Sequence, residues 1–394
     1  MKRSGTASQT TDADLIIVGA SFAGLTAART AAMRGLRVIV LEAKPEPGAR
    51  IHTSGILVRE AIEEIDIPSQ LTRRVPGVRL YAPNLRSMDL FSPGYAFFTT
   101  RTADLMRWMA HEAEAAGATV LCGQRFTGAT RENGTYVIEG LGLRTRYLVG
   151  ADGATSRVAR SLGLGQNRRH LVGVEIEFEL DDAVDPRFLH CFVDSKIAPG
   201  YIAWAAPGPD TIQIGAATTR GRRPDLDAFL ARTEGLFGWS RLKEVGRRGG
   251  LIPAGGPVGR THGEGAMLIG DAAGWVSPAT GGGIRLAFRW GRRAAALIAD
   301  HLQSGGPDPG PILAREVPHF RLKRLMRAAL DLAPPNAILN LALSTPPMRA
   351  FAEWVYFRRR GSDMDRKAFL DWLERQPDGT AERRALPPSG EIVS

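Results

Sequence analysis

Cysteine is scarce in this 394-residue chain, where only Cys122 and Cys191 occur. Two cysteines cannot build a disulfide framework, and no cysteine and histidine cluster has the spacing of a metal site. Long hydrophobic runs are also missing. The longest uncharged run, 332–348, is interrupted by four prolines, so no membrane-spanning helix is expected. The first apolar stretch, 15–28, has no cleavage site after it, so no secretory signal is expected either.

Lysine is rare too: it supplies only six of the 51 basic residues, while the formal net charge is +10. A positive field favours anionic cofactors, anionic lipid surfaces or nucleic acid. The densest basic run, 358–360, has no interleaved aromatic residues, so nucleic-acid binding is not expected. These features predict a cytoplasmic protein, with peripheral contact at the inner membrane face as an open alternative. They do not indicate an oligomeric state.

The N-terminal region has the pattern of a β-α-β unit. An aliphatic run at 15–18 ends at Gly19 and is typical of a buried parallel strand. A helix is expected over 22–34, followed by a second strand over 38–41. A crossover of this kind is right-handed and predicts a doubly wound sheet of the Rossmann type.

The turn between this strand and helix carries a dinucleotide-binding fingerprint, GASFAG at 19–24. Ser21 replaces the middle glycine, and its hydroxyl is a candidate donor to a phosphate. Glu42, followed by Ala43, ends the second strand and suits a ribose hydroxyl. The candidate contacts within the fingerprint are Gly19, Ser21, Phe22, Ala23 and Gly24.

The region 170–219 has a different pattern. Apolar residues alternate there with Glu175, Glu177 and Glu179, which predicts an antiparallel strand with the glutamates facing solvent. Further along, 304–311 has the composition of a linker. The stretch 318–332 predicts an amphipathic helix, which either packs on the protein or rests on anionic lipid.

Two more motifs follow in the chain: GADGATSRV at 150–158, and LIGDAAG at 268–274 with a glycine run at 281–283. With the first fingerprint they resemble the three flavin motifs of the flavoprotein hydroxylase superfamily, whose fold is that of para-hydroxybenzoate hydroxylase. The resemblance implies FAD, with Asp271 near the ribityl chain and the start of the following helix beside the flavin pyrimidine edge. The positive end of a helix there would stabilise negative charge. The further FAD contacts implied are Asp152, Gly270, Asp271, Gly282, Gly283 and Ile284.

Within that superfamily the chain most resembles the geranylgeranyl reductase family, over residues 14–301. The segment PGYIAWAAP at 199–207 is similar to a family segment beside the substrate cavity, so Tyr201 and Trp204 are candidate substrate contacts or ordinary core residues. Many members carry a Cys-Gly pair where this chain reads 49–55 without cysteine. His52 in that stretch is a candidate proton donor or a loop histidine. Arg50 and Arg101 are candidate FAD contacts by resemblance, or surface arginines.

The leading interpretation is an FAD-dependent reductase, in which reduced flavin passes hydride to a carbon–carbon double bond of a prenyl or other lipophilic substrate. No second dinucleotide fingerprint occurs, so electrons would come from transiently bound NAD(P)H or a reduced carrier. An alternative is a single-component monooxygenase that hydroxylates an aromatic or polyketide-like substrate. A flavin-free prenyl-binding escort, resembling the GDP-dissociation inhibitors, is disfavoured because the motifs around Asp152 and Asp271 are intact.

The expected fold class is α/β, with a Rossmann-like FAD-binding domain interleaved with an antiparallel-sheet substrate domain and followed by C-terminal helices. FAD-binding segments are expected at 12–70, 101–165 and 261–303, and substrate-domain segments at 71–100 and 166–260. A helical region at 312–375 and a flexible tail at 376–394 complete the expected organisation.

Overall fold

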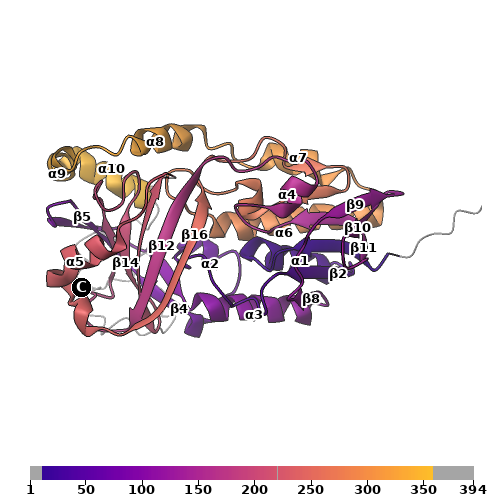
Figure 1. Ribbon diagram of the computed structural model, residues 1–394, viewed down its shortest axis with the longest axis horizontal. Helices are drawn as coiled ribbons and strands as arrows, with labels where there is room; N and C mark the ends of the chain where they lie inside the picture. The colour runs from indigo at the N-terminus through magenta and orange to yellow at the C-terminus, as the bar shows by residue number, and fades with distance from the viewer. Residues whose placement is uncertain (1–10, 220, 358–394) are drawn as a thin grey trace, which may run out of the picture.

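The computed structural model describes residues 11–219 and 221–357 (Figure 1). The basic run at 358–360 and the tail from 376 lie outside these residues. Figure 1 shows an elongated molecule with a parallel sheet in one half and a large antiparallel sheet in the other. Among the described residues, no helix has both the length and the apolar character needed to cross a membrane.

The first half is built on a sheet whose centre is β1 (Ala13–Val18), paired in parallel with β2 (Val38–Glu42) and β11 (Arg144–Gly150). The sheet is completed by β8 (Thr119–Cys122), β18 (Ala266–Leu268), β17 (His262–Gly263), β9 (Ala129–Glu132) and β10 (Thr135–Ile138). Its helical elements are α1 (Phe22–Met33), α3 (Thr102–Ala115), α4 (Arg157–Ser161), η3 (Gly270–Ala273) and α6 (Ile284–Ser304). The expected β-α-β unit is therefore present.

The second half is built on a seven-stranded sheet in the order β16-β12-β15-β14-β13-β5-β6. Its strands are β16 (Glu244–Pro253), β12 (His170–Glu179), β15 (Thr211–Thr219), β14 (Ala203–Pro207), β13 (Phe188–Phe192), β5 (Gly77–Tyr81) and β6 (Ser87–Phe91). All pairs are antiparallel except β13 with β5. This arrangement confirms the predicted fold class.

Smaller elements cover the faces of this sheet. A three-stranded sheet contains β3 (Leu57–Val58), β4 (Thr72–Val75) and β7 (Phe97–Thr100), beside α2 (Arg59–Ile62) and η1 (Ser69–Leu71). α5 (Leu226–Phe237) and η2 (Trp239–Arg241) cover the opposite face, where Phe229 and Phe237 pack against the sheet. Both faces of the seven-stranded sheet are consequently buried over its centre.

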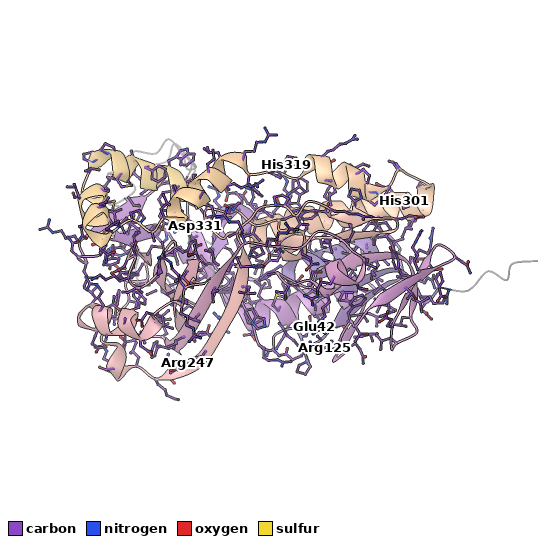
Figure 2. The ribbon with its side chains drawn as sticks, turned by 45° about the horizontal axis from the view of Figure 1, so that its top comes forward. Glu42, Arg125, Arg247, His301, His319 and Asp331 are labelled. Atoms are coloured by element: carbon purple, nitrogen blue, oxygen red, sulfur yellow. The ribbon has the colours of Figure 1, made fainter. Side chains whose placement is uncertain are left out.

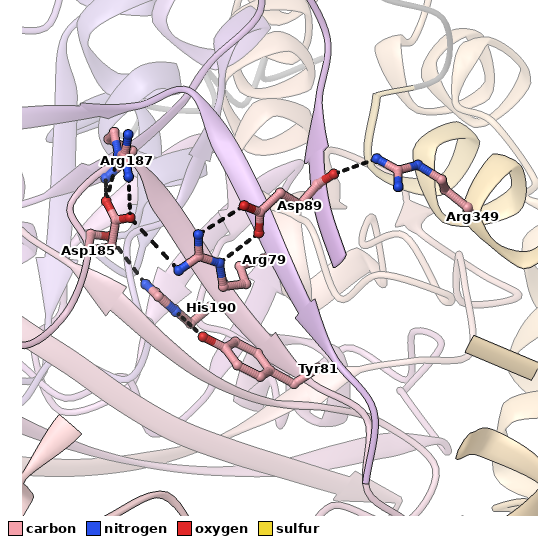
Figure 3. A network of polar contacts seen from close by, with 7 residues as sticks. All are labelled: Arg79, Tyr81, Asp89, Asp185, Arg187, His190 and Arg349. Atoms are coloured by element: carbon pink, nitrogen blue, oxygen red, sulfur yellow. Dashed lines mark hydrogen bonds and ion pairs between the residues drawn. The ribbon is translucent and has the colours of Figure 1, made fainter. Parts of the chain in front are cut away.

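The C-terminal helices are α7 (Pro309–Glu316), α8 (Arg321–Asp331), α9 (Asn336–Leu343) and α10 (Pro346–Phe357). α7 begins inside the stretch predicted as a linker, because Asp308 caps it by accepting a hydrogen bond from the Gly310 amide at 2.9 Å. α10 is fixed to β6 by Arg349, which donates to the Asp89 carbonyl at 2.9 Å (Figure 3). α10 is thus tied to the substrate half, whereas α7 packs on α6 and β17 of the other half.

The same region contains a polar network that Figure 3 shows between β5, β6 and β13, with Tyr81 and His190 buried and the charged side chains partly exposed. Arg79 donates to both oxygens of Asp89 at 2.6 and 2.9 Å, and Tyr81 lies 3.0 Å from His190 Nδ1. Burial lowers the pKa of His190 to about 4, so this histidine is neutral at physiological pH. The network therefore has a structural role in joining the strands.

The amphipathic helix expected over 318–332 is present as α8, and its leucines face outward. Leu322 and Leu325 on α8 are 61% and 69% exposed, whereas Arg327 is 1% exposed. Two nitrogens of the Arg327 guanidinium are hydrogen-bonded inside the protein: Nη2 donates to the Gly200 carbonyl, and Nε donates to Asp331 at 2.9 Å. The third, Nη1, has no hydrogen-bond partner among the described residues. An arginine whose charge is paired and hydrogen-bonded can occupy the buried side of a helix.

The prediction that Glu175 faces solvent is wrong, since its side chain is only 5% exposed. Its carboxylate pairs with Arg248 on β16 and accepts a hydrogen bond from Trp204 Nε1 at 3.1 Å. Burial raises the pKa of Glu175, while Arg248 opposes that rise. Glu177, 24% exposed, pairs with the same arginine at 3.0 Å, and Glu179 is exposed as predicted.

Replacing Glu175 with Ala should therefore destabilise the protein by about 3–5 kcal/mol, because it removes a partner of the buried Arg248 charge. Glu177→Ala is the matched control, and its more exposed pair should cost below about 1 kcal/mol. Urea unfolding followed by circular dichroism measures both values. Equal losses for the two variants would contradict the assignment of Glu175 as the buried partner.

Candidate functional site

The turn between β1 and α1 is held by close backbone contacts that require glycine. Gly19 has φ +105°, and a Cβ there would lie 2.5 Å from the Ala151 carbonyl oxygen. A Cβ at Gly24 would overlap the Gly19 carbonyl oxygen. The first motif therefore packs directly on the second, which begins at Gly150.

Ser21 is the N-cap of α1, and its Oγ accepts a hydrogen bond from the Gly24 amide at 3.1 Å. The hydroxyl proton of Ser21 remains free to be donated. No described residue accepts a hydrogen bond from the amides of Phe22 and Ala23, as is normal in the first turn of a helix. Free amides at the positive end of α1 form a fitting site for a phosphate.

Glu42 ends β2 beside this turn and is 7% exposed. One carboxylate oxygen accepts from the Ala20 amide at 2.8 Å and the other from the Lys44 amide at 2.9 Å, across Ala43. Each oxygen keeps one further lone pair, so the fixed carboxylate can still accept from ribose hydroxyls. Figure 2 labels Glu42 in the parallel-sheet half, while Arg247 on β16 lies in the other half.

The third motif, although about 250 residues later in the chain, packs against the start of α1. Gly270 has φ +59°, and a Cβ there would lie 2.8 Å from the Ala23 Cβ at the start of α1. The backbone carbonyl of Asp271 accepts from Asn167 Nδ2 at 2.8 Å, and the same amide group donates to the Ala154 carbonyl at 3.1 Å. Asn167 thus links the second motif to the third. No sequence pattern around Asn167 predicts this role.

The Asp271 carboxylate has no hydrogen bond or ion pair with any residue in the described ranges. Burial raises its pKa to about 6. A half-buried carboxylate without donors is unfavourable, so a ligand that offers hydroxyl groups fits this position. A Cβ at Gly283 would lie 3.4 Å from Asp271 Oδ1, which shows that the glycine leaves space beside the carboxylate.

Gly283 is also the N-cap of α6, which begins at Ile284 and has no side-chain cap. The preceding loop turns at Gly281, with φ +64°, and is closed by the Gly282 carbonyl, which accepts from the Ser277 amide at 3.0 Å. The amides that follow Gly282 therefore form a second free helix N-terminus. Free amides at α1, the Glu42 carboxylate, the Asp271 carboxylate and free amides at α6 fit the phosphate, ribose, ribityl and flavin parts of FAD.

Three other predicted FAD contacts are not at a free binding position. Two of these side chains are bonded to other residues of the protein, and the third is exposed to solvent. Asp152 accepts from the Ser156 hydroxyl at 2.6 Å and from two amides at the start of α4. Arg101 precedes α3 and pairs with Asp210. Arg50 is exposed and has φ +44°. FAD contacts by these residues remain predictions.

Tyr201 joins the substrate half to the third motif. Its hydroxyl donates to the Thr280 carbonyl, and a Cβ at Gly281 would lie 2.8 Å from that hydroxyl. Burial raises the pKa of Tyr201 to about 12, so the phenol stays protonated and remains a donor. The Arg327 guanidinium carbon lies 5.9 Å from the ring centre.

Trp204 and His52 lie on one face of the seven-stranded sheet. Trp204 on β14 pairs with Gly215 on β15, and the indole occupies the space that a side chain at Gly215 would fill. On the other side of Gly215, its partner on β12 is Glu175. His52 Nδ1 lies 2.9 Å from the Gly249 carbonyl, and a Cβ at Gly250 would lie 3.2 Å from the His52 Cβ. The structure thus brings both predicted residues to the face of the sheet that carries Glu175 and Arg248, called here the inner face, where His52 is exposed. Sequence reasoning missed Glu175 and Arg248.

The pKa of Asp271 predicts how the FAD-free protein responds to pH. Because folding raises this pKa from 3.8 to about 6, the folded form keeps a proton that the unfolded chain releases. Stability should therefore fall as pH rises from about 4 to about 6. Asp271→Asn should remove this component, as thermal unfolding across that range would measure. An unchanged pH dependence would contradict the burial of the carboxylate.

The same site predicts a loss of FAD. Asp271→Ala should retain less FAD than the wild type after gel filtration, measured by flavin absorbance, because the acceptor for the ribityl hydroxyls is gone. Asp300→Asn, an exposed acid on α6, is the matched control and should retain wild-type FAD. Equal FAD content in all three proteins would exclude Asp271 from the site.

The comparisons with known proteins agree with this geometry. Residues 12–308 match the family model described as an FAD binding domain. The chain is 29% identical to digeranylgeranylglycerophospholipid reductase of Methanothrix thermoacetophila, over 77% of this chain and 82% of the relative. It is 30% identical to digeranylgeranylglycerophospholipid reductase 2 of Methanopyrus kandleri, over 74% and 78%.

Solved structures show the same fold at low identity. A geranylgeranyl bacteriochlorophyll reductase-like protein from Thermoplasma acidophilum has a TM-score of 0.76 at 22% identity, over 92% of this chain and 96% of that one. The flavin-dependent brominase Bmp2 has a TM-score of 0.67 at 17% identity, over 92% and 98%. The family match and the relatives establish that the chain is an FAD-dependent oxidoreductase and belongs to the geranylgeranyl reductase family of FAD-binding proteins.

Proposed function

We propose that the protein reduces carbon–carbon double bonds in the prenyl chain of a lipid. The observation that carries the proposal is the contact of Tyr201 with Gly281 and Thr280, which sets the inner face of the substrate sheet against the flavin motif. The substrate class follows from the curated relatives, which are named as reductases of digeranylgeranylglycerophospholipids. Their substrate is an alkene-rich lipid, so the same class is proposed here.

When bound, FAD supplies the hydride that adds to one carbon of the double bond. The residues of this chain then have three tasks. The free amides at the start of α6 and its positive end stabilise negative charge beside Gly283. Glu175 and Arg248 hold the Trp204 indole on the inner face, so that it lines the space for the prenyl chain.

The third task is to protonate the other alkene carbon, and His52 is the proposed donor. Its Nδ1–H donates to the Gly249 carbonyl at 2.9 Å, which fixes the ring. When the ring is protonated, Nε2–H is the group left to donate a proton to the substrate. A backbone carbonyl in this position orients a histidine without neutralising it.

The reducing equivalents are proposed to come from NAD(P)H that binds transiently or from a reduced carrier. The first motif supports only the FAD nucleotide, and no second such motif occurs in the sequence. Because the proposed substrate is a membrane lipid, peripheral contact at the inner membrane face is part of the proposal.

A second candidate function is monooxygenation of an aromatic or polyketide-like compound. The observation in its favour is the fold shared with a Pseudomonas aeruginosa protein described as a probable FAD-dependent monooxygenase, at a TM-score of 0.64 and 18% identity. Fold similarity alone does not carry an activity. The relatives with higher identity favour the reductase.

Product mass separates the two functions. The purified protein, reduced by dithionite without oxygen, is incubated with a geranylgeranylated glycerophospholipid, and the lipid is analysed by mass spectrometry. The reductase adds two hydrogens for each double bond and needs no oxygen. An unchanged lipid, together with air-dependent addition of one oxygen atom to a phenol in a parallel incubation with NAD(P)H, would instead support the monooxygenase.

Replacing His52 with Gln should slow lipid reduction by at least about 100-fold, the usual contribution of a general acid. The rate of flavin reduction by dithionite should be unchanged, because His52 acts after electrons have entered. His111→Gln, at an exposed position on α3, is the control and should behave as wild type. Wild-type turnover in His52→Gln would contradict the role of His52 as proton donor.

A further inference from the structure

Large hydrophobic side chains are concentrated on the surface of the C-terminal helices. The described residues include thirteen exposed large hydrophobics, and eight of them fall within 322–354. These eight are Leu322, Leu325, Leu330, Leu332, Ile338, Leu341, Phe351 and Trp354. A concentration of this kind on a folded protein marks an interaction surface.

The exposed residues follow helical spacing, so they form stripes. On α8, Leu322, Leu325 and Leu332 share one side with Ala329 between them, and Leu325 is 69% exposed. On α9, Leu341 is 72% exposed one turn after Ile338. Figure 1 shows α8 and α9 along one outer edge of the molecule. We call this edge, with its eight exposed residues, the leucine edge.

The opposite side of α8 is anchored to the protein by two side chains, so the exposure is not a sign of a loosely attached helix. Arg327 binds the Gly200 carbonyl, next to Tyr201. Lys323 Nζ lies 3.0 Å from Ser277 Oγ in the loop that leads to α6. The helix therefore holds its leucines outward while its inner side contacts the flavin motif.

Positive charge borders the leucine edge. Arg315, Arg321 and Arg324 are exposed and have no ion pair with a residue in the described ranges. The acids of these helices are already paired: Glu316 with Arg293, Asp331 with Arg327 and Glu353 with Arg349. Apolar stripes bordered by unpaired arginines are the pattern of a helix that lies in the interface of an anionic membrane.

We propose that the leucine edge is the surface on which the protein docks to an anionic lipid bilayer. This inference deepens the proposed function and rests on it for the source of the substrate. A second copy of the chain is a poorer occupant, because a two-fold interface would bring the unpaired arginines of both copies together. Docking here would place the bilayer on the side of the molecule that contains the Tyr201 and Thr280 junction.

Sedimentation with vesicles tests the proposal on the full-length FAD-loaded protein. The vesicles contain phosphatidylcholine alone, or phosphatidylcholine with one third phosphatidylglycerol. The wild type should sediment with the anionic vesicles and be released by high salt. The double variant Leu325→Gln, Leu341→Gln should bind at least about tenfold more weakly, because two fully exposed leucines no longer enter the bilayer.

A matched control separates the leucine edge from hydrophobicity in general. Met33 and Leu236 are exposed elsewhere, at 67% and 42%, and Met33→Gln with Leu236→Gln should bind as wild type. Arg321→Gln should weaken binding to anionic vesicles about fivefold and leave neutral vesicles unaffected, as expected for one interfacial arginine. Equal loss in the Met33 and Leu325 double variants would overturn the proposal.

Two further results would also overturn it. One is a wild type that does not sediment with anionic vesicles. The other is a dimer, seen by light scattering without lipid, that the Leu325 and Leu341 changes dissociate. Reduction of a detergent-dispersed prenyl lipid, measured in parallel, separates this proposal from the proposed function: the leucine variants should keep that activity. Vesicle binding by a protein that reduces no lipid would overturn the function and leave the docking surface in place.

Discussion

The close approach of backbone segments around the start of α1 is the constraint on which the rest of the structure depends. Gly19 lies against Ala151, and a Cβ at Gly291 would lie 2.7 Å from the Ala23 carbonyl oxygen. Phe22 packs edge-to-face on Phe288, with ring centroids 5.6 Å apart, and this contact helps to hold α6 against α1. A side chain at Gly291 would push apart α1 and α6, whose N-termini fit the phosphate and flavin parts of FAD. Three sequence motifs become one site through this packing.

Buried charge connects that site to the second half of the molecule. Arg327 and the Glu175–Arg248 pair lie where the substrate sheet meets its covering elements, and each has protein partners. Removing a charge from water is unfavourable, so such groups are tolerated where geometry supplies hydrogen bonds. In this protein they fix Tyr201 and Trp204, the two aromatic side chains between the sheet and the flavin motif. The polar groups thus position the apolar ones.

The FAD-binding half could be predicted from the sequence because its signals are local. Gly19, Gly24 and Glu42 belong to one β-α-β unit, and the spacing of glycine and acid reports the geometry of that unit directly. The burial of Glu175 could not be predicted, because strand alternation shows that two faces differ and not that both are covered. The orientation of α8 could not be predicted for a related reason. Its sequence pattern distinguishes two sides of the helix but not which one faces inward. Arg327 faces inward because it binds the Gly200 carbonyl, which is distant in sequence, and Asp331 at the end of the helix.

The contact between Ala23 and Gly291 also sets the order of events during synthesis. These residues meet in space but are 268 positions apart, from 23 to 291. The ribosome must therefore release about three quarters of the chain before α6 can complete the pocket that α1 begins. Contacts at such separation make folding slow, and early segments wait with apolar surface exposed. Binding of the cofactor is consequently a late step in the maturation of this protein, after all strands of the substrate sheet have been synthesised.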